Sequence, residues 1–305
     1  MVDDMENGGL IGPERRRRRL FRQRKIPVRF LVPNFFTLLS LCAGVTAIRM
    51  GIEAKYDLAV ALIVAAALLD GVDGRLARAL KAQSRFGAEL DSLADFINFG
   101  VAPVIVVFTW GLGGIKGLGW IAALVFSCGM ALRLARFNAM LDVDKPKWQS
   151  NYFTGIPAPA GAVTVLLPLY LEGIGLVDMR QWPLAVSAYT IAMASLLVST
   201  LPTFSGKLMG ERISREWVLP LLVVAASLVG FLVTYPYPTL TVLTLVYLGM
   251  IPISYRRFAW HQKQWDAEVA RHGGAPADAA TAATPAVAHG MPRDLPSGDP
   301  GPTRH

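Results

Sequence analysis

The chain has 305 residues, of which 53% are hydrophobic and 17% are charged, and its formal net charge is +8. Soluble domains carry about a quarter charged residues, so this composition argues against an ordinary soluble protein. The basic excess does not require a nucleic-acid partner, and we expect none, because the distribution of basic residues follows a membrane topology.

Basic residues are concentrated at the N-terminus, in residues 1–29. Five consecutive arginines, Arg15–Arg19, stand ahead of the first apolar stretch. Because Lys and Arg near the ends of spans favour the cytoplasmic side, this segment is predicted to be a basic cytoplasmic arm. Anionic membrane lipids are its expected partners.

Residues 30–260 are predicted to form a single membrane domain. A hydrocarbon core roughly 30 Å thick needs about 20 apolar residues per helix. The apolar stretches predict an all-α, polytopic membrane bundle of about eight transmembrane helices, with six or seven as alternatives. Their expected ranges are 33–52, 56–78, 93–112, 117–138, 157–172, 183–202, 217–235 and 238–255. Alternation from the arm places both termini, and the loops around 79–88, 136–156 and 203–216, on the cytoplasmic face of the cell (inner) membrane.

Aromatic residues near the ends of the predicted spans are expected to be interfacial anchors. They are Trp110, Trp120, Trp182, Trp217, Tyr235 and Tyr237. We expect these side chains to meet lipid headgroups rather than a bound ligand.

Acidic residues gather where the second predicted span ends and the third begins. Asp70 and Asp73 are three residues apart, and Asp91 and Asp95 are four apart, so each pair shares one face of its helix. The short connection at 79–86 favours antiparallel neighbouring helices. We therefore expect the four carboxylates to converge just inside the cytoplasmic surface.

Such a group of carboxylates requires compensation by cations. Carboxylates within a few ångströms repel one another, and all-oxygen ligation suits Mg²⁺, Mn²⁺ or Ca²⁺ rather than Zn²⁺. Two ions in one site would form a clamp on a phosphoryl group. Gly71, Gly74 and Gly87 leave space for a ligand nearby, and Arg78 could neutralise a phosphate at the interface.

Three alternatives remain for the acidic residues. They could form ion pairs in a polar loop with the neighbouring basic residues Arg75, Arg78, Lys81 and Arg85. They could form the transport site of a divalent-cation transporter, although such sites usually lie near the membrane midplane. The protein could also be an inert membrane scaffold, in which replacing the aspartates would be harmless.

The residues from Asp70 to Asp95 follow the pattern D-x-x-D-G-x-x-A-R-x8-G-x-x-x-D-x-x-x-D at every specified position. This pattern resembles the signature of the CDP-alcohol phosphotransferase family. Within that family the chain looks most like the CDP-diacylglycerol–serine O-phosphatidyltransferase (phosphatidylserine synthase) branch. The resembling segments lie at 32–45, 84–103, 133–138 and 152–162.

The resemblance implies a metal-dependent enzyme that transfers a phosphatidyl group from CDP-diacylglycerol to L-serine and releases CMP. It implies that Asp70, Asp73 and Asp91 hold the metal ions, with Asp95 as a shared ligand or base. It also implies that the CDP site is lined by Gly74, Ala77, Arg78 and Gly87. Sibling enzymes that use glycerol 3-phosphate or an inositol phosphate as the acceptor remain an alternative, although their pockets should need more basic residues.

The histidines lie outside the predicted membrane core and cannot serve as its proton acceptor. They are His261, His272, His289 and His305. Asp95, one turn beyond the metal ligand Asp91, is therefore the expected general base. With Asp91 it forms the predicted catalytic pair.

Two further groups of residues are candidates for substrate contacts. The carboxylate of serine calls for a cation, and Arg133 and Arg136 lie near the cytoplasmic end of the fourth predicted span; topological anchoring explains them equally well. Asn34 and Thr37 open the first span at the same depth and could contact the nucleotide, although Asn34 could instead be a helix cap.

The C-terminal residues 261–305 are predicted to be a disordered cytoplasmic tail, because Ala, Pro, Gly and Asp dominate and apolar residues are scarce. A homodimer is left open, since the periodicity assigns no interface.

Overall fold

The computed structural model describes residues 31–140, 152–204 and 215–272. The described residues are helical apart from loops and two three-residue strands, which confirms the all-α fold class. They fall into two compact units, one within Met1–Leu134 and Pro157–Val198 and the other within Ala135–Ile156 and Ser199–His305. The predicted arm lies outside the described residues.

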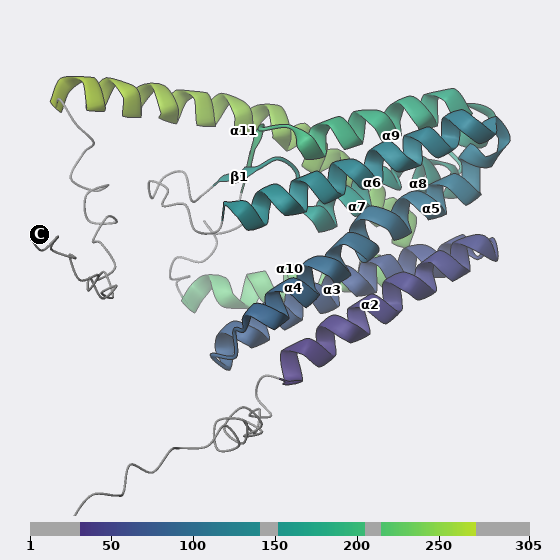
Figure 1. The fold of residues 1–305 in the computed structure, drawn as a ribbon, viewed down its shortest axis with the longest axis horizontal. Coiled ribbons are helices and arrows are strands. Elements are labelled where there is room, and N and C mark those ends of the chain that lie inside the picture. The colour runs from purple at the N-terminus through teal and green to yellow at the C-terminus, as the bar shows by residue number, and fades with distance from the viewer. Residues whose placement is uncertain (1–30, 141–151, 205–214, 273–305) are drawn as a thin grey trace, which may run out of the picture. The chain divides into compact units, whose positions relative to one another are not determined.

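In the first unit, helix α2 (Leu31–Ile52) packs along helix α3 (Tyr56–Ala79) (Figure 1). The buried positions of α2 recur every third or fourth residue and are mostly small: Pro33, Thr37, Ser40, Gly44, Ala47 and Gly51. The facing stripe of α3 contains Ala59, Val60, Ile63 and Ala66. Small side chains on both helices allow the two backbones to approach closely, as is common between membrane helices.

A long, interrupted helix follows α3 and covers Arg85–Ile115. Its segments are α4 (Arg85–Asp95), the π-helix η2 (Phe96–Val101), α5 (Ala102–Val107), the π-helix η3 (Phe108–Leu112) and the 3-10 turn η4 (Gly113–Ile115). Pro103 explains the first widened turn, because proline supplies no N–H and its ring clashes with the carbonyl of the fourth residue before it. We have no comparable account of η3.

The rest of the first unit consists of shorter helices around this long one. Helix α6 (Lys116–Ala139) is followed by α7 (Ala158–Val165), α8 (Leu167–Gly173), the 3-10 turn η6 (Met179–Gln181) and α9 (Pro183–Val198). Ser127 of α6 donates a hydrogen bond to the carbonyl of Gly100 in η2 (2.9 Å). Gly100 lies against Met130, so a larger residue in this turn would collide with α6.

A polar cluster joins the helix ends at the predicted outer side of this unit. The guanidinium of Arg180 pairs with the Glu172 carboxylate (2.8 Å) and lies over the rings of Tyr56 and Trp110, each 5.6 Å away. The indole N–H of Trp110 also donates to Glu172 (3.3 Å). Trp110 is only 5% exposed, so its predicted role as a lipid-facing anchor is wrong. Its N–H has a carboxylate partner inside the bundle, which removes the reason for reaching the interface.

The second unit contains a short strand pair and two long helices. Strand β1 (Tyr152–Thr154) pairs antiparallel with β2 (Pro202–Phe204), with Phe153 opposite Thr203. Helix α10 (Arg215–Thr234) and helix α11 (Pro236–His272) pack together and are separated by Tyr235 alone.

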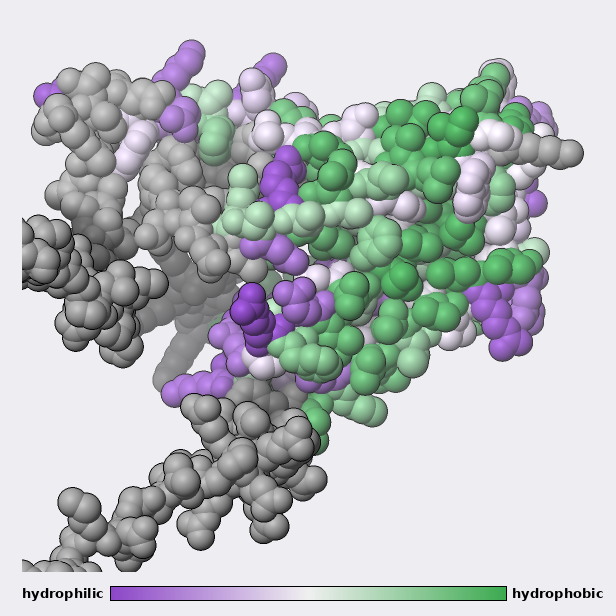
Figure 2. Space-filling model, viewed as in Figure 1, coloured by the Kyte–Doolittle hydropathy of each residue, from purple (hydrophilic) through white to green (hydrophobic). Residues whose placement is uncertain are grey.

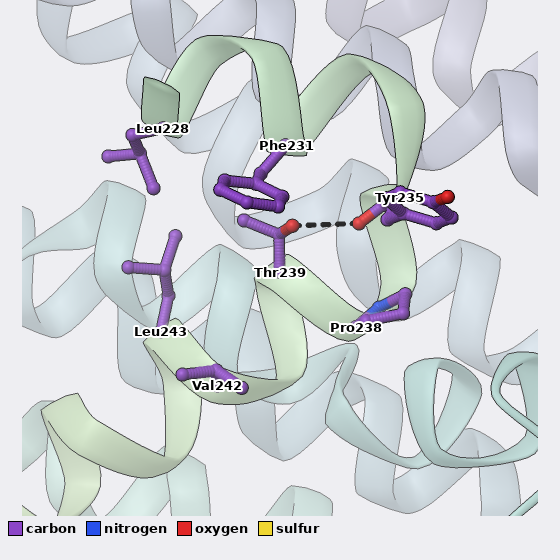
Figure 3. Close-up of a pocket in the computed structure, with 7 residues that line it drawn as sticks. All are labelled: Leu228, Phe231, Tyr235, Pro238, Thr239, Val242 and Leu243. Carbon is purple, nitrogen blue, oxygen red and sulfur yellow. Dashed lines mark hydrogen bonds between the residues drawn. The ribbon is translucent and has the colours of Figure 1, made fainter. Parts of the chain in front are cut away.

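An apolar hollow of about 420 Å³ lies between α10 and α11 (Figure 3). It is lined by Leu228, Phe231, Tyr235, Pro238, Thr239, Val242 and Leu243. The hydroxyl of Thr239 donates to the Tyr235 carbonyl of its own chain turn (2.8 Å), so it is not available to a ligand as a donor. The hollow therefore offers hydrophobic contact and no acidic group.

By length and composition, five of the described helices could cross a membrane: Leu31–Ile52, Arg85–Ile115, Gly117–Ala139, Trp217–Thr234 and Pro236–Trp265. The number of eight is therefore not confirmed. Helix α3 is long enough, but Asp57, Asp70 and Asp73 interrupt its apolar character. The predicted span at 157–172 is divided into α7 and α8, because Pro168 follows the break.

Large hydrophobic side chains are exposed along the described helices. Figure 2 shows them over the middle of the helices, with hydrophilic residues gathered toward the helix ends. Leu68, Leu184 and Val233 are each more than 60% exposed. A soluble monomer rarely presents such a surface, and a hydrocarbon environment explains it.

Helix α11 continues to His272, beyond residue 260, where the membrane domain was predicted to end. The prediction of disorder is therefore wrong for residues 261–272. This segment contains no Gly or Pro and is built largely from good helix formers, so it extends the preceding helix. The Ala-, Pro- and Gly-rich composition begins only after it, outside the described residues.

Candidate active site

The acidic residues of α3 lie in its last two turns. Asp70 is half-buried and Asp73 is only 3% exposed. The hydroxyl of Thr37, on α2, lies within hydrogen-bonding reach of the Asp73 carboxylate and also donates to the carbonyl of Pro33 (3.2 Å). Thr37 thus contacts the acidic region from the neighbouring helix, at the depth expected from its position in the sequence.

The second acidic pair is positioned by the start of α4. Ser84 caps this helix: its hydroxyl accepts a hydrogen bond from the backbone N–H of Gly87 (3.0 Å). Gly87 has little room for a side chain, because a Cβ would lie 3.0 Å from the Asn34 carboxamide oxygen and 3.1 Å from the Ser84 hydroxyl. The cap and this close approach set α4 against α2 one turn before Asp91.

Carboxylates from the two helices converge as the spacing predicts. Asp70, Asp91 and Asp95 each offer an oxygen atom, and these three atoms lie within 4.8 Å of one another. All three side chains are half-buried. Asp73 is not one of this close group, although its charge acts on Asp91. The structure therefore brings three of the four predicted ligands together and leaves the fourth beside them.

The acidic group has the chemistry of a divalent-cation site. Asp73 Oδ2 and Asp95 Oδ1 are buried and have no hydrogen-bond partner among the described residues. A buried, unpaired carboxylate oxygen is costly unless a cation or donor meets it. All donors are oxygen atoms, the set that Mg²⁺ and Mn²⁺ prefer. This group could hold a metal ion.

The alternative that the aspartates form ion pairs with nearby basic residues is not supported. Within the described part of the chain, no ion pair links any of the four aspartates to Arg75, Arg78, Lys81 or Arg85. The ion pairs found there join Glu53 to Arg49 and Lys55, and Glu172 to Arg180. The positive charge that the acidic group needs does not come from the α3–α4 connection.

Open space adjoins the acidic residues of α3. A Cβ built on Gly71 or Gly74 would meet no atom within 4 Å, so neither glycine is required by packing within the protein. Glycine inside a helix costs about 1 kcal/mol relative to alanine. Arg78, one turn after Gly74, is exposed, and Ala77 is half-buried beside it. These residues leave room for a ligand beside the carboxylates.

The structure gives the two candidate arginines of α6 different surroundings. Arg133 lies close enough to Asp95 for its positive charge to act on that carboxylate. Arg136 instead donates a hydrogen bond to the backbone carbonyl of Ser199 (3.0 Å). Arg133 is thus associated with the acidic group, whereas Arg136 holds the chain after α9.

One feature beside the site was not predicted from the sequence. Asn98 is 1% exposed and its Nδ2 donates to the Ser40 hydroxyl (2.8 Å), which in turn donates to the carbonyl of Ala66 (2.9 Å). Asn98 follows Asp91 by seven residues and Asp95 by three, so it continues their helix face. That spacing was the only available signal, because the partners are distant in sequence.

Family comparison matches these residues to a known enzyme group. The model described as CDP-alcohol phosphatidyltransferase matches residues 30–201, which contain the whole acidic pattern. The chain belongs to the CDP-alcohol phosphatidyltransferase family. A second model, described as CDP-alcohol phosphatidyltransferase 2, matches residues 216–252 in α10 and α11. The protein is therefore an enzyme of this family, and the inert-scaffold alternative is excluded.

Curated relatives cover most of the chain. A CDP-diacylglycerol–serine O-phosphatidyltransferase of Mycobacterium leprae is 40% identical over 243 residues, 77% of this chain and 79% of the relative. A protein of the same name from Helicobacter pylori is 32% identical over 72% of this chain and 88% of the relative. An archaetidylserine synthase of Methanothermobacter thermautotrophicus is 30% identical over 60% of this chain and 73% of the relative.

Proposed function

We propose that this family member transfers the phosphatidyl group of CDP-diacylglycerol to L-serine, giving phosphatidylserine and CMP. The observation that carries this proposal is the convergence of Asp70, Asp91 and Asp95 from two helices, next to the open space at Gly71 and Gly74. The choice of serine is supported by the names of the relatives from Mycobacterium leprae and Helicobacter pylori. We place this reaction at the cytoplasmic face of the cell membrane.

The cytidine diphosphate would occupy the space beside the glycines. Its proposed contacts come from α2, α3 and α4: Asn34, Thr37, Gly74, Ala77, Arg78 and Gly87. Arg78, which is exposed at the end of α3, would meet a phosphate, because a guanidinium can donate two parallel hydrogen bonds to one. The acyl chains would remain among the hydrophobic side chains and lipid.

Divalent cations, Mg²⁺ or Mn²⁺ and two in number, are the proposed cofactor, held by Asp70, Asp73, Asp91 and Asp95. When bound, they neutralise the diphosphate and stabilise the charge that develops on the CMP leaving group. The unpaired oxygens of Asp73 and Asp95 support this assignment.

The protein's own side chains would position and deprotonate the acceptor. The serine hydroxyl oxygen forms a bond to the phosphatidyl phosphorus, the bond from that phosphorus to CMP breaks, and the hydroxyl proton passes to Asp95. Arg133, close to Asp95, would hold the serine carboxylate. The proposal thus requires proton transfer and carboxylate binding on the same side of the acidic group.

The decisive experiment measures CMP release by the purified protein in lipid–detergent micelles containing CDP-diacylglycerol. We expect release to require serine and Mn²⁺ or Mg²⁺, and to stop when a chelator is added. Glycerol 3-phosphate and an inositol phosphate serve as alternative acceptors in parallel reactions.

CMP release with glycerol 3-phosphate but not with serine would refute the proposed acceptor while keeping the family assignment. Serine-dependent release that persists in excess chelator would refute the metal assignment. A variant with Glu89 replaced by Gln is the matched control, because Glu89 is exposed on α4 two residues before Asp91.

A further inference from the structure

Three helices are joined by consecutive hydrogen bonds one turn away from the acidic group. Asn98 of η2 donates to the Ser40 hydroxyl of α2 (2.8 Å), and Ser40 donates to the carbonyl of Ala66 in α3 (2.9 Å). Asn98 and Ser40 are each 1% exposed. We call this pair of residues the Ser40–Asn98 bridge.

The bridge has a defined relation to the acidic residues on both helices. Ala66 precedes Asp70 by four residues, and Asn98 follows Asp95 by three. On each helix the bonded position and the carboxylate therefore share a face and are one turn, about 5 Å, apart along the axis. The bridge holds together the same two helix faces that carry Asp70 and Asp95.

The bridge is also confined by its surroundings. A Cβ on Gly44 of α2 would lie 2.8 Å from Asn98 Cγ and 3.1 Å from Asn98 Cα, so the carboxamide fills the space that this glycine leaves. The Asn98 side chain therefore has little freedom to adopt another rotamer. Its position fixes η2 against α2.

Stability alone does not explain an asparagine at this position. Among the described residues, Asn98 Oδ1 has no hydrogen-bond partner although the side chain is buried. Burying an unpaired carboxamide oxygen costs free energy, which an apolar residue of similar size would avoid. A buried polar group that is retained despite this cost can specify one arrangement of the packed helices.

The long helix needs such a specification at this point. Asn98 lies inside the π-helix η2, between the acidic segment α4 and the following α5. Each residue of a helix turns it by about 100°, so a one-residue change in the widened turn would rotate Asp91 and Asp95 away from Asp70. The hydrogen bond to Ser40 holds one of these arrangements.

We propose that Asn98 and Ser40 are positioning residues, which set the rotation of α4 so that Asp91 and Asp95 face Asp70 and complete the cation site. This inference rests on the proposed function only for the cation-binding role of the aspartates, and it is independent of the acceptor alcohol.

The test compares Asn98→Ala, Ser40→Ala and the double variant by Mn²⁺ titration of purified protein, followed by electron paramagnetic resonance. We expect each single variant to bind Mn²⁺ about tenfold more weakly. Because both substitutions remove the same contact, the double variant should be no weaker than Asn98→Ala. With CDP-diacylglycerol and serine, kcat at subsaturating Mn²⁺ should fall and excess Mn²⁺ should restore part of it.

Ser127→Ala is the matched control, since it also removes a hydrogen bond to η2, from α6 to the Gly100 carbonyl. It should lower thermal stability to a similar extent with Mn²⁺ affinity changed less than about twofold. Unchanged Mn²⁺ affinity in folded Asn98→Ala or Ser40→Ala protein would overturn the inference, as would additive losses in the double variant.

Failure of the proposed function would look different. Wild-type protein that binds Mn²⁺ but releases no CMP with serine would refute the acceptor and leave the Mn²⁺ comparison valid. If Asn98→Ala does not fold, Ser40→Ala breaks the same contact by loss of a single oxygen atom, and its Mn²⁺ affinity decides the question.

Discussion

At the scale of single residues, Asp95 has the surroundings expected of a proton acceptor. Its Oδ1 is buried without a hydrogen-bond partner among the described residues, and its other neighbours are Asp70, Asp91 and Arg133. Asp73, by contrast, is met by the Thr37 hydroxyl. The four aspartates of the pattern are therefore not equivalent, although the sequence presents them as two similar pairs.

Replacing Asp95 by Asn keeps the shape of the side chain and removes its ability to accept a proton. We expect Asp95→Asn to lower kcat by about 10²- to 10⁴-fold, while CDP-diacylglycerol still binds. Equilibrium binding of the lipid nucleotide and single-turnover CMP release measure the two effects separately. Near-normal turnover in this variant would remove Asp95 from the role of base.

The two arginines of α6 provide a second test at this scale. Arg133→Gln should raise the KM for serine about tenfold or more, because a charge-assisted hydrogen bond to the carboxylate is lost. Arg136→Gln is the matched substitution one turn away, and it removes the bond to the Ser199 carbonyl. It should lower thermal stability with little change in this KM. Equal KM effects in both variants would contradict the assignment.

At the scale of secondary-structure elements, the start of α4 controls how Asp91 enters the site. Ser84 caps the helix through the Gly87 N–H, and Gly87 lies in contact with Asn34 of α2. The preceding turn carries Lys81 with a φ of 49°, a backbone conformation that favours glycine. The connection from α3 to α4 is thus short and tightly defined.

Removing the cap should loosen this element without touching the carboxylates. Ser84→Ala is expected to destabilise the first turn of α4 by about 1 kcal/mol, which hydrogen exchange of residues 85–88 would report. Ser84→Asp retains a capping oxygen and should behave like the wild type. If the amides of this turn exchange at the same rate in Ser84→Ala and wild-type protein, the cap does not stabilise α4.

At the scale of the whole molecule, the exposed hydrophobic surface and the five long apolar helices agree with a multi-pass membrane protein. The cytoplasmic orientation of the acidic group and the homodimer remain predictions. The orientation follows from the placement of basic residues alone.

Cysteine accessibility tests the orientation directly. In a background in which Cys42 and Cys128 are replaced by alanine, we introduce Gln83→Cys in the α3–α4 connection or Leu176→Cys after α8, both at exposed positions. A membrane-impermeant maleimide added to intact cells should label position 176 and not position 83. Lysis should make position 83 reactive. The reverse pattern would place the acidic group on the outer side.

Local sequence determined the parts of this protein that depend on spacing along one helix. The pairs Asp70–Asp73 and Asp91–Asp95 share helix faces because their separations match the helical period, and the same spacing identified the family. Apolar length predicted most of the helices. These properties need no knowledge of which segments become neighbours.

Only the tertiary structure decided the properties that depend on contacts between distant residues. Ser40 and Asn98 are 58 positions apart, and Trp110 and Glu172 are 62 apart. The distinction between Arg133 and Arg136, the burial of Trp110 and the separation of Asp73 from the other three carboxylates all arise from such contacts. A helical period fixes which residues share a face, but the packing of neighbouring helices decides what that face meets.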